Sequence, residues 1–195
     1  MNNYVYALDI GENETSNLTS NSTTLQKFTG ANATVNISNS ATLERANQPV
    51  LVNEQSGGTV TVESGSTISA TVANTIQGID SANLTVTNSG TIQAGTSKAI
   101  NLTDNEGARV TNNAGGIIKS DTNTISLSEN TGDVVDDIII TNHGTIFATD
   151  NSDTSGHNVI KSSDGVTNLT INNEKGGHIY HGTDKAVILL GGDAT

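Results

Sequence analysis

The side chains best suited to chemistry in this chain are four histidines, two arginines and several clustered carboxylates. An imidazole can ligate a metal and can act as a general acid or base near neutral pH. The histidines are His143, His157, His178 and His181. A zinc site needs three or four ligands, and the sequence supplies no cysteine and no further ligand at a suitable spacing. We therefore interpret these histidines as surface residues and predict no metal site.

Catalysis on polysaccharides would require clustered carboxylates, a cationic acid or base, and aromatic side chains that stack on sugars. Arg45 and Arg109 fall at different positions of a sequence repeat, and aromatic residues make up only 3% of the chain, with no Trp. The Gly-x-Ser-x-Gly motif of serine hydrolases does not occur either. The sequence favours a non-enzymatic protein without a cofactor and leaves a polysaccharide-active enzyme as a minor alternative.

The stretch DNSDTSGH, residues 150–157, resembles half of a calcium-binding loop, because Asp150, Ser152 and Asp153 offer oxygen atoms. It lacks the 12-residue spacing and the bidentate glutamate of an EF-hand. The simpler interpretation is an acidic loop in solvent.

Composition limits the partners of the chain. The formal net charge is −12, so phosphate backbones and anionic membrane surfaces are repelled, and we expect neither nucleic acid nor membrane insertion. Hydrophobic residues make up 33% of the chain, which is low for a globular core. Such a chain can fold only if its few apolar residues are buried very regularly.

That regularity comes from a repeat of about 24 residues, which lengthens near the C-terminus. The apolar residues that lead each unit are separated by 25, 24, 24, 30 and 31 residues, and they are Ile37, Val62, Val86, Val110, Ile140 and Ile171. A second apolar position follows in each unit, at Leu43, Ile68, Ile92, Ile118, Ile146 and Ile179. A third follows at Val50 or Val52, Ile76, Ile100, Ile125, Ile160 and Val187.

Three short alternating segments per unit predict an all-β fold, a right-handed parallel β-helix of about six to seven coils with three strands each. One unit cannot bury a core alone, so the coils must stack. We expect residues 31–195 to form these coils and residues 1–30 to form an N-terminal cap or irregular first coil.

A polar position follows two residues after each lead and is most often asparagine. Stacked asparagines can hydrogen-bond along a column, and we predict such a ladder from Asn39, Asn88, Asn112, Asn142 and Asn173, with Ser64 in the remaining unit. A glycine follows at Gly65, Gly90, Gly116, Gly144 and Gly177, where we expect a positive φ at a sharp turn.

The line VTNSGTIQAGTSKAINL, residues 86–102, resembles the passenger domains of bacterial type V autotransporters, and the likeness extends over residues 33–195. The resemblance implies a β-helix exported through a C-terminal β-barrel and exposed on the cell surface or secreted. By that comparison, this sequence is an N-terminal fragment without the barrel. It also implies a virulence-related role as an adhesin or receptor-binding effector on host cells.

Two interruptions of the repeat are the candidate interaction sites, because insertions in a solenoid form loops. They are residues 128–137 and 149–158, and both are acidic. The candidate residues are Glu129, Asp133, Asp136, Asp137, Asp150, Asp153 and His157. We expect a host cell-surface protein or receptor as the partner.

Self-association of bacteria through the polar faces of the solenoid is the alternative role. A third possibility, an ice-binding face, would need strictly repeated threonines. Counted from the predicted lead residue of each unit, the positions equivalent to Thr87 hold Ser38, Glu63, Thr111, Thr141 and Asn172. Threonine is therefore not strictly repeated, which argues against such a face.

Overall fold

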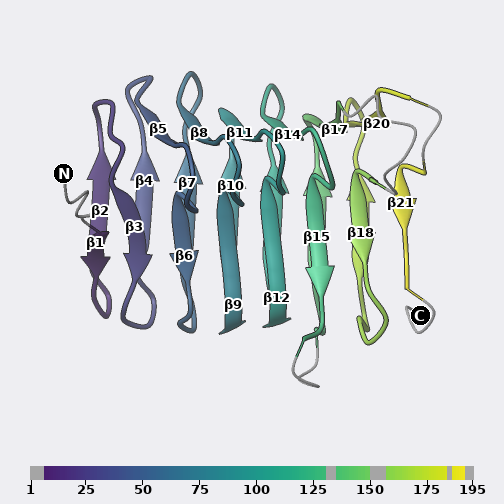
Figure 1. Cartoon of the computed structure of the whole chain (residues 1–195), viewed down its shortest axis with the longest axis horizontal. Helices are drawn as coiled ribbons and strands as arrows, with labels where there is room; N and C mark the ends of the chain where they lie inside the picture. Colours follow the sequence, from purple (N-terminus) through teal and green to yellow (C-terminus); the bar gives the residue numbers. More distant parts are fainter. Residues whose placement is uncertain (1–6, 131–134, 150–156, 184–185, 192–195) are drawn as a thin grey trace.

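The computed structural model describes residues 7–130, 135–149, 157–183 and 186–191, and the regular structure within these ranges is entirely β-strand. Successive strands visit three parallel sheets in turn, so the chain winds as a right-handed parallel β-helix (Figure 1). From the second coil to the seventh, each coil gives one strand to each sheet. The predicted fold class is confirmed.

The three sheets are named A, B and C in the order in which the chain visits them. Sheet A contains β1 (Ala7–Ile10), β3 (Leu25–Phe28), β6 (Leu51–Asn53), β9 (Ile76–Ala82), β12 (Ile100–Glu106), β15 (Ile125–Ser128), β18 (Ile160–Ser162) and β21 (Ile188–Leu189). Sheet B contains β2 (Thr15–Leu18), β4 (Thr34–Ile37), β7 (Thr59–Val62), β10 (Thr85–Asn88), β13 (Arg109–Asn112), β16 (Ile139–Asn142) and β19 (Thr170–Asn173). Sheet C contains β5 (Thr42–Arg45), β8 (Thr67–Ala70), β11 (Thr91–Ala94), β14 (Ile117–Ser120), β17 (Thr145–Ala148) and β20 (His178–His181).

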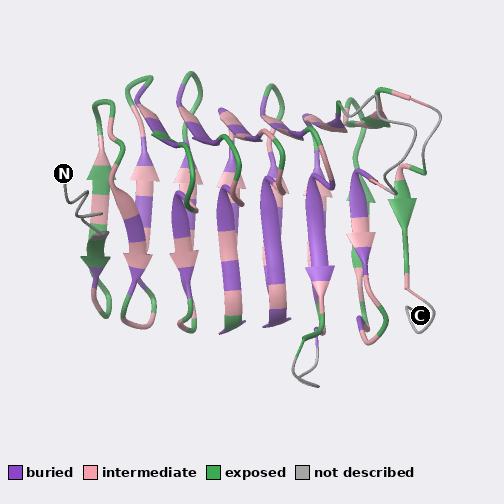
Figure 2. Cartoon of the chain, in the orientation of Figure 1, coloured by how far each residue is buried: buried purple, intermediate pink, exposed green. Residues whose placement is uncertain are grey.

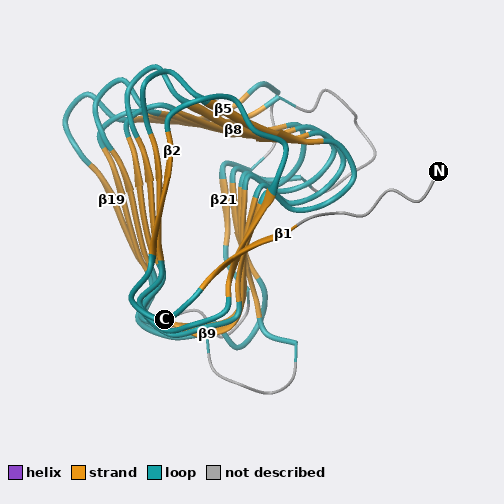
Figure 3. Cartoon of the chain, turned by 90° about the vertical axis from the view of Figure 1, so that its left-hand side faces the viewer, coloured by secondary structure: helices purple, strands orange, loops and turns teal. Residues whose placement is uncertain are grey.

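The core lies between the three sheets, which enclose it when the solenoid is viewed along its axis (Figure 3). Side chains alternate between the two faces of a strand, so in β10 Val86 is buried and Thr87 points outward. Strands pair with their counterparts in the coils above and below, which stacks the inward residues into columns (Figure 2). The second predicted column is correct throughout, and it contains Leu43, Ile68, Ile92, Ile118, Ile146 and Ile179.

The lead column is correct only from the fourth coil onward. Val86, Val110, Ile140 and Ile171 are aligned, but Val60 and Val35 precede them instead of the predicted Val62 and Ile37. A shift of two residues keeps every apolar side chain on the inner face, so period-2 alternation cannot detect it. In the third column, Ile76, Ile100, Ile125 and Ile160 are aligned as predicted, whereas Leu51 and Ile188 take the end positions predicted for Val50 or Val52 and for Val187.

The turn from sheet A to sheet B has a residue with a positive φ two positions before each strand of sheet B. These residues are Asn13, Asn32, Gly57, Asn83, Gly107, Asp137 and Asn168, with φ between 47° and 76°. Asn, Asp and Gly tolerate this left-handed conformation best, because a larger or branched side chain crowds its own backbone there. One corner geometry is therefore built from three residue types that look unrelated in the sequence.

Regular pairing starts before residue 31, where the sequence analysis places the first repeat. β1 pairs with β3 and β2 pairs with β4, both in register with the later coils. The first coil differs in sheet C, where Ser22 forms an isolated bridge to Leu43 in place of a strand. Phe28, the largest of the fully buried side chains, fills the core at this end.

Candidate functional site

Asparagine side chains link four coils at the corner between sheets B and C. The Nδ2 of Asn88 donates to Oδ1 of Asn112, Asn112 donates likewise to Asn142, and Asn142 donates to Asn173, each over 2.8 Å. The first three side chains are fully buried, and each also donates to backbone carbonyls of the corners, such as Gly116 and Thr145 for Asn112. This ladder fixes the corners and is unavailable to a ligand.

Asn39 lies outside the ladder and corrects the prediction at that position. It is exposed at a turn with φ of 55°, and the column below Asn88 continues with Val62 and Ile37. The two-residue register shift explains the error. The ladder begins in the fourth coil, and the lower coils fill the same column with apolar side chains.

The corner glycines are required mainly for close approach, which corrects a second prediction. Among the five predicted glycines only Gly65 has a positive φ. A Cβ on Gly90 would lie 2.3 Å from the carbonyl oxygen of Ser66, and one on Gly144 would lie 2.3 Å from that of Gly116. Stacked corners thus leave no space for a side chain.

Both ends of the insertion 128–137 are fixed to neighbouring coils. The N–H of Glu129 donates to Oγ of Ser163 over 3.1 Å, and Glu129 itself is exposed. At the other end Val135 is fully buried and forms a bridge with Val166. Asp133, between these ends, lies outside the described residues. The described ends of the insertion are therefore part of the solenoid.

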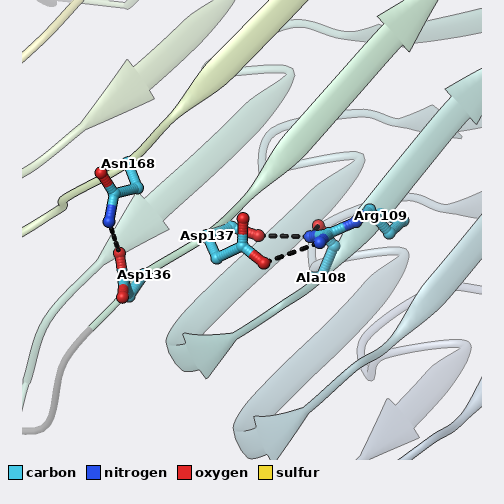
Figure 4. A network of polar contacts seen from close by, with 5 residues as sticks. All are labelled: Ala108, Arg109, Asp136, Asp137 and Asn168. Atoms are coloured by element: carbon cyan, nitrogen blue, oxygen red, sulfur yellow. Dashed lines mark hydrogen bonds and ion pairs between the residues drawn. The ribbon is translucent and has the colours of Figure 1, made fainter.

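The carboxylates of Asp136 and Asp137 contact their own chain (Figure 4). Oδ1 of Asp136 accepts hydrogen bonds from Thr167 over 2.9 Å and from Asn168 over 2.8 Å, and these bonds lower the pKa of the carboxyl. Oδ2 of Asp137 lies 2.7 Å from Nη2 of Arg109, and Nη1 of Arg109 also donates to the Asp137 carbonyl. Asp137 and Arg109 are more than a third exposed, so their ion pair adds little stability.

The insertion 149–158 begins and ends on the solenoid. The N–H of Thr149 donates to the carbonyl of Ser120 over 2.9 Å, and that of Asn158 donates to Oδ1 of Asn123 over 2.8 Å. His157 is half-buried beside Asn158. Asp150 and Asp153 lie outside the described residues. The described ends of the first insertion lie at the corner between sheets A and B, and those of the second lie at the corner between C and A.

The histidines of the solenoid are spread over different positions. His178 is exposed at the start of β20 and pairs with Thr145, while His143 is exposed one coil earlier, at the corner before β17. His181 is half-buried and accepts hydrogen bonds at Nδ1 from Thr183. Within the described ranges, no group of three or more His, Asp or Glu side chains could hold a metal ion. No helix long and apolar enough to cross a membrane occurs in those ranges either.

Two aromatic side chains come together that the sequence analysis did not connect. Phe147 and Tyr180 are paired across β17 and β20 and stack with ring centroids 5.1 Å apart and an interplanar angle of 6°. They are 33 residues apart in the chain. The contact follows from the register of sheet C. The signal in the sequence is that each aromatic residue directly follows an apolar residue of the second column, Phe147 after Ile146 and Tyr180 after Ile179.

A buried arginine is the second feature that the sequence analysis missed. Arg45 ends β5 and is 9% exposed, and its Nη1 has no hydrogen-bond partner among the described residues. Burial alone lowers the pKa of its guanidinium. The same inward column continues with Ala70 and Ala94, so the charge is confined to the end of the solenoid where the first coil lacks a sheet-C strand.

No known family model, curated protein or solved structure matches the chain. The fold is a parallel β-helix. The strand pairing carries this assignment by itself, and the likeness to autotransporter passengers stays a prediction based on the repeated N-x-G-T-I line.

The outer face of sheet B is uncharged apart from Arg109. Its two outward columns carry mostly Thr and Asn, and they read Thr15, Thr34, Thr59, Thr85, Arg109, Ile139 and Thr170 beside Asn17, Asn36, Thr61, Thr87, Thr111, Thr141 and Asn172. Thr61 and Asn36 thus align with Thr87, in place of the predicted Glu63 and Ser38. Complete Thr-x-Thr pairs occur in two adjacent coils only, so the face still lacks the strict repetition of an ice-binding surface.

Proposed function

We propose that the chain is a non-enzymatic interaction module of an autotransporter passenger, exposed at the bacterial surface or secreted, that contacts host cells. One observation carries the proposal. The buried polar side chains of the corners hold the coils together, while the outward residues form long, regular columns on a rigid scaffold. Such a surface is suited to recognition, since binding residues are commonly displayed on rigid frameworks.

The two insertions support this role because they interrupt an otherwise regular surface. Their ends are anchored by Glu129, Val135 and Asn158, so a partner would meet segments whose ends are fixed to the solenoid. The described anchors also define where a deletion can be made without damaging the core.

The test removes only the loop centres. Deletion of residues 131–134 keeps Val135 in the core and Asp136 on Thr167, and deletion of residues 150–156 keeps Thr149 and Asn158 in place. We expect the fluorescently labelled wild-type chain to bind cultured epithelial cells and at least one deletion to weaken binding severalfold. Circular dichroism should remain of the β type in both variants.

The matched control is Asn172→Ala, on the outer face of sheet B and away from both insertions, which should bind cells like the wild type. If the wild-type chain binds cells no better than a denatured sample does, the proposed function is wrong. If both deletions bind normally, binding belongs to a face of the solenoid and not to the loops.

Self-association is the second candidate, and the outer face of sheet B favours it because its two outward columns contain no carboxylate. On a chain with net charge −12, two copies could meet at this surface without repulsion between carboxylates. Seven strands about 4.8 Å apart and four residues long span only about 400 Å². A stable interface buries about 800 Å² per partner, so association through this face would be weak.

Sedimentation velocity over a wide concentration range tests that candidate. We expect reversible association that Thr87→Glu and Thr61→Glu abolish by placing like charges on the face. A single monomer boundary at the highest concentration would eliminate self-association as a role.

A further inference from the structure

A groove of about 300 Å³ runs along the outer face of sheet C. Its floor is an outward column with one residue from each of four consecutive coils, namely Glu44, Ser69, Gln93 and Lys119. Its wall is formed by the turns that lead from sheet C toward sheet A, at Thr71, Gly95, Asp121 and Thr149. The groove is therefore straight, parallel to the solenoid axis, and lined by hydrogen-bonding groups.

The aromatic pair continues the floor column beyond the groove. Lys119 pairs with Phe147, which pairs with Tyr180, so six outward residues follow one line over about 24 Å. The separation of the two rings is close to the strand spacing, which places the stack along the axis. Tyr180 is 46% exposed. Two of the five Phe and Tyr residues of the chain thus stand at the end of this polar groove.

Two of the four polar side chains on this floor, Glu44 and Lys119, are free for a ligand. The side chains of Glu44 and Lys119 make no hydrogen bond or ion pair to another described residue, and Gln93 contacts only Ser69, over 3.1 Å. Sugar hydroxyls both donate and accept hydrogen bonds, and sugar rings pack their C–H faces on aromatic side chains. We infer that the groove binds a linear, neutral glycan, with polar contacts along the floor and ring contacts at Phe147 and Tyr180.

Charge selects a neutral glycan over an acidic one. Two carboxylates, Glu44 and Asp121, face one ammonium, Lys119, and the whole chain has a net charge of −12. A uronic acid or sulfated polymer would be repelled. An extended peptide would pair with a strand edge, whereas this groove lies on the face of a sheet.

The same spacing argues for binding without cleavage. Glu44 and Asp121 belong to coils three steps apart, which separates them by about 14 Å along the axis. Glycosidase carboxylates lie roughly 5–9.5 Å apart. The inference rests on the proposed function as a binding module and names the class of molecule that one of its faces recognises.

Native gel electrophoresis in gels that contain one polysaccharide tests the inference. The neutral probes are mannan, galactomannan, xyloglucan and dextran, and the anionic probes are polygalacturonate and hyaluronan. We expect at least one neutral probe to retard the wild-type chain and the anionic probes to leave its mobility unchanged. Tyr180→Ala should weaken binding at least about fivefold because an exposed stacking surface is lost. Lys119→Ala, which cannot disturb the core, should weaken it in the same direction.

The matched control is Thr87→Ala, an outward substitution on sheet B that should leave retardation unchanged. Absence of retardation by all four neutral probes would overturn the inference. Stronger retardation by an anionic probe than by the neutral probes would also overturn it. The same holds if the Tyr180→Ala and Lys119→Ala variants are retarded as strongly as the wild type. Cell binding is measured in parallel on the same samples. Cell binding without any neutral-glycan retardation would reject the groove while leaving the proposed function intact.

Discussion

At the scale of single residues, the buried polar side chains fall into two groups with opposite effects on stability. Asn88, Asn112 and Asn142 are fully buried, and each has its amide satisfied by its neighbour and by the corner backbone. Arg45 is also buried, but its Nη1 has no partner among the described residues. A satisfied polar group specifies the register, whereas an unsatisfied charge costs free energy.

Asn112→Ala should lower the free energy of unfolding by about 3 kcal/mol, because it removes several buried hydrogen bonds at once. These include the bond from Nδ2 of Asn88 and the bonds to the carbonyls of Gly116 and Thr145. Urea unfolding followed by circular dichroism measures the change. Asn172→Ala, exposed on sheet B, is the control and should stay within about 0.5 kcal/mol of the wild type. Equal effects of the two substitutions would contradict a stabilising ladder.

Arg45→Met should raise the free energy of unfolding by about 1–2 kcal/mol, since a flexible apolar side chain replaces a desolvated charge. Arg109→Met is the comparison, because that guanidinium is exposed and paired with Asp137 and its loss should cost a few tenths of a kcal/mol. Thermal unfolding should show a higher melting temperature for Arg45→Met and a slightly lower one for Arg109→Met than for the wild type. A lower melting temperature for Arg45→Met would show that the guanidinium stabilises the end of the solenoid.

At the scale of elements, the corner between sheets B and C occurs in two lengths. Val86 and Ile92 are six residues apart, as are Ile140 and Ile146, whereas the other coils use eight residues between the same columns. The asparagine ladder passes through both kinds of corner without interruption. Glycines allow this because consecutive corners touch through their backbones.

Gly144→Ala should destabilise the protein by more than about 3 kcal/mol, because its Cβ would collide with the carbonyl oxygens of Gly116 and Asn113 at 2.3 and 2.5 Å. Gly115→Ala meets open space and suffers only from its φ of 82°, so about 1 kcal/mol is expected. Chemical unfolding of the two variants distinguishes the destabilisation caused by close approach at Gly144 from that caused by backbone conformation at Gly115. A larger effect at Gly115 would reverse this assignment.

At the scale of the whole molecule, the solenoid depends on contacts between adjacent coils. Each strand of sheets B and C pairs only with its counterparts one coil away, and the core extends as columns along the axis. Stability is then approximately a sum over coils and their interfaces. The length of a coil can be tested directly, because residues 85–108 make up one coil of 24 residues.

Deletion of residues 85–108 should give a folded protein, because it brings Val110 over Val60 and Ile118 over Ile68 with every sheet preserved. We expect an unchanged β-type circular dichroism spectrum per residue and a cooperative melt at a modestly lower temperature. Deletion of residues 85–96 removes half a coil and directs each later strand to the wrong sheet, so its melt should lose cooperativity. Indistinguishable behaviour of the two deletions would contradict the coil assignment.

The sequence by itself determined the fold class, the three strands per coil and the column from Leu43 to Ile179. Alternating Ile, Val and Thr in short segments at a period near 24 residues leaves few other ways to bury so little apolar surface. The asparagines from Asn88 to Asn173 were also visible, because their spacing from the lead residue is constant over those coils.

Only the tertiary structure decided the register of the first coils, and with it the chemistry of the outer faces. A two-residue shift leaves inward residues inward, so nothing in the alternation excludes Asn39 from the ladder or aligns Thr61 with Thr87. Strand pairing across coils also brought Phe147 onto Tyr180 and buried Arg45, whose Nη1 finds no hydrogen-bond partner in the described part of the chain. Such contacts depend on corner lengths, which are set by packing between coils and not by local sequence preference.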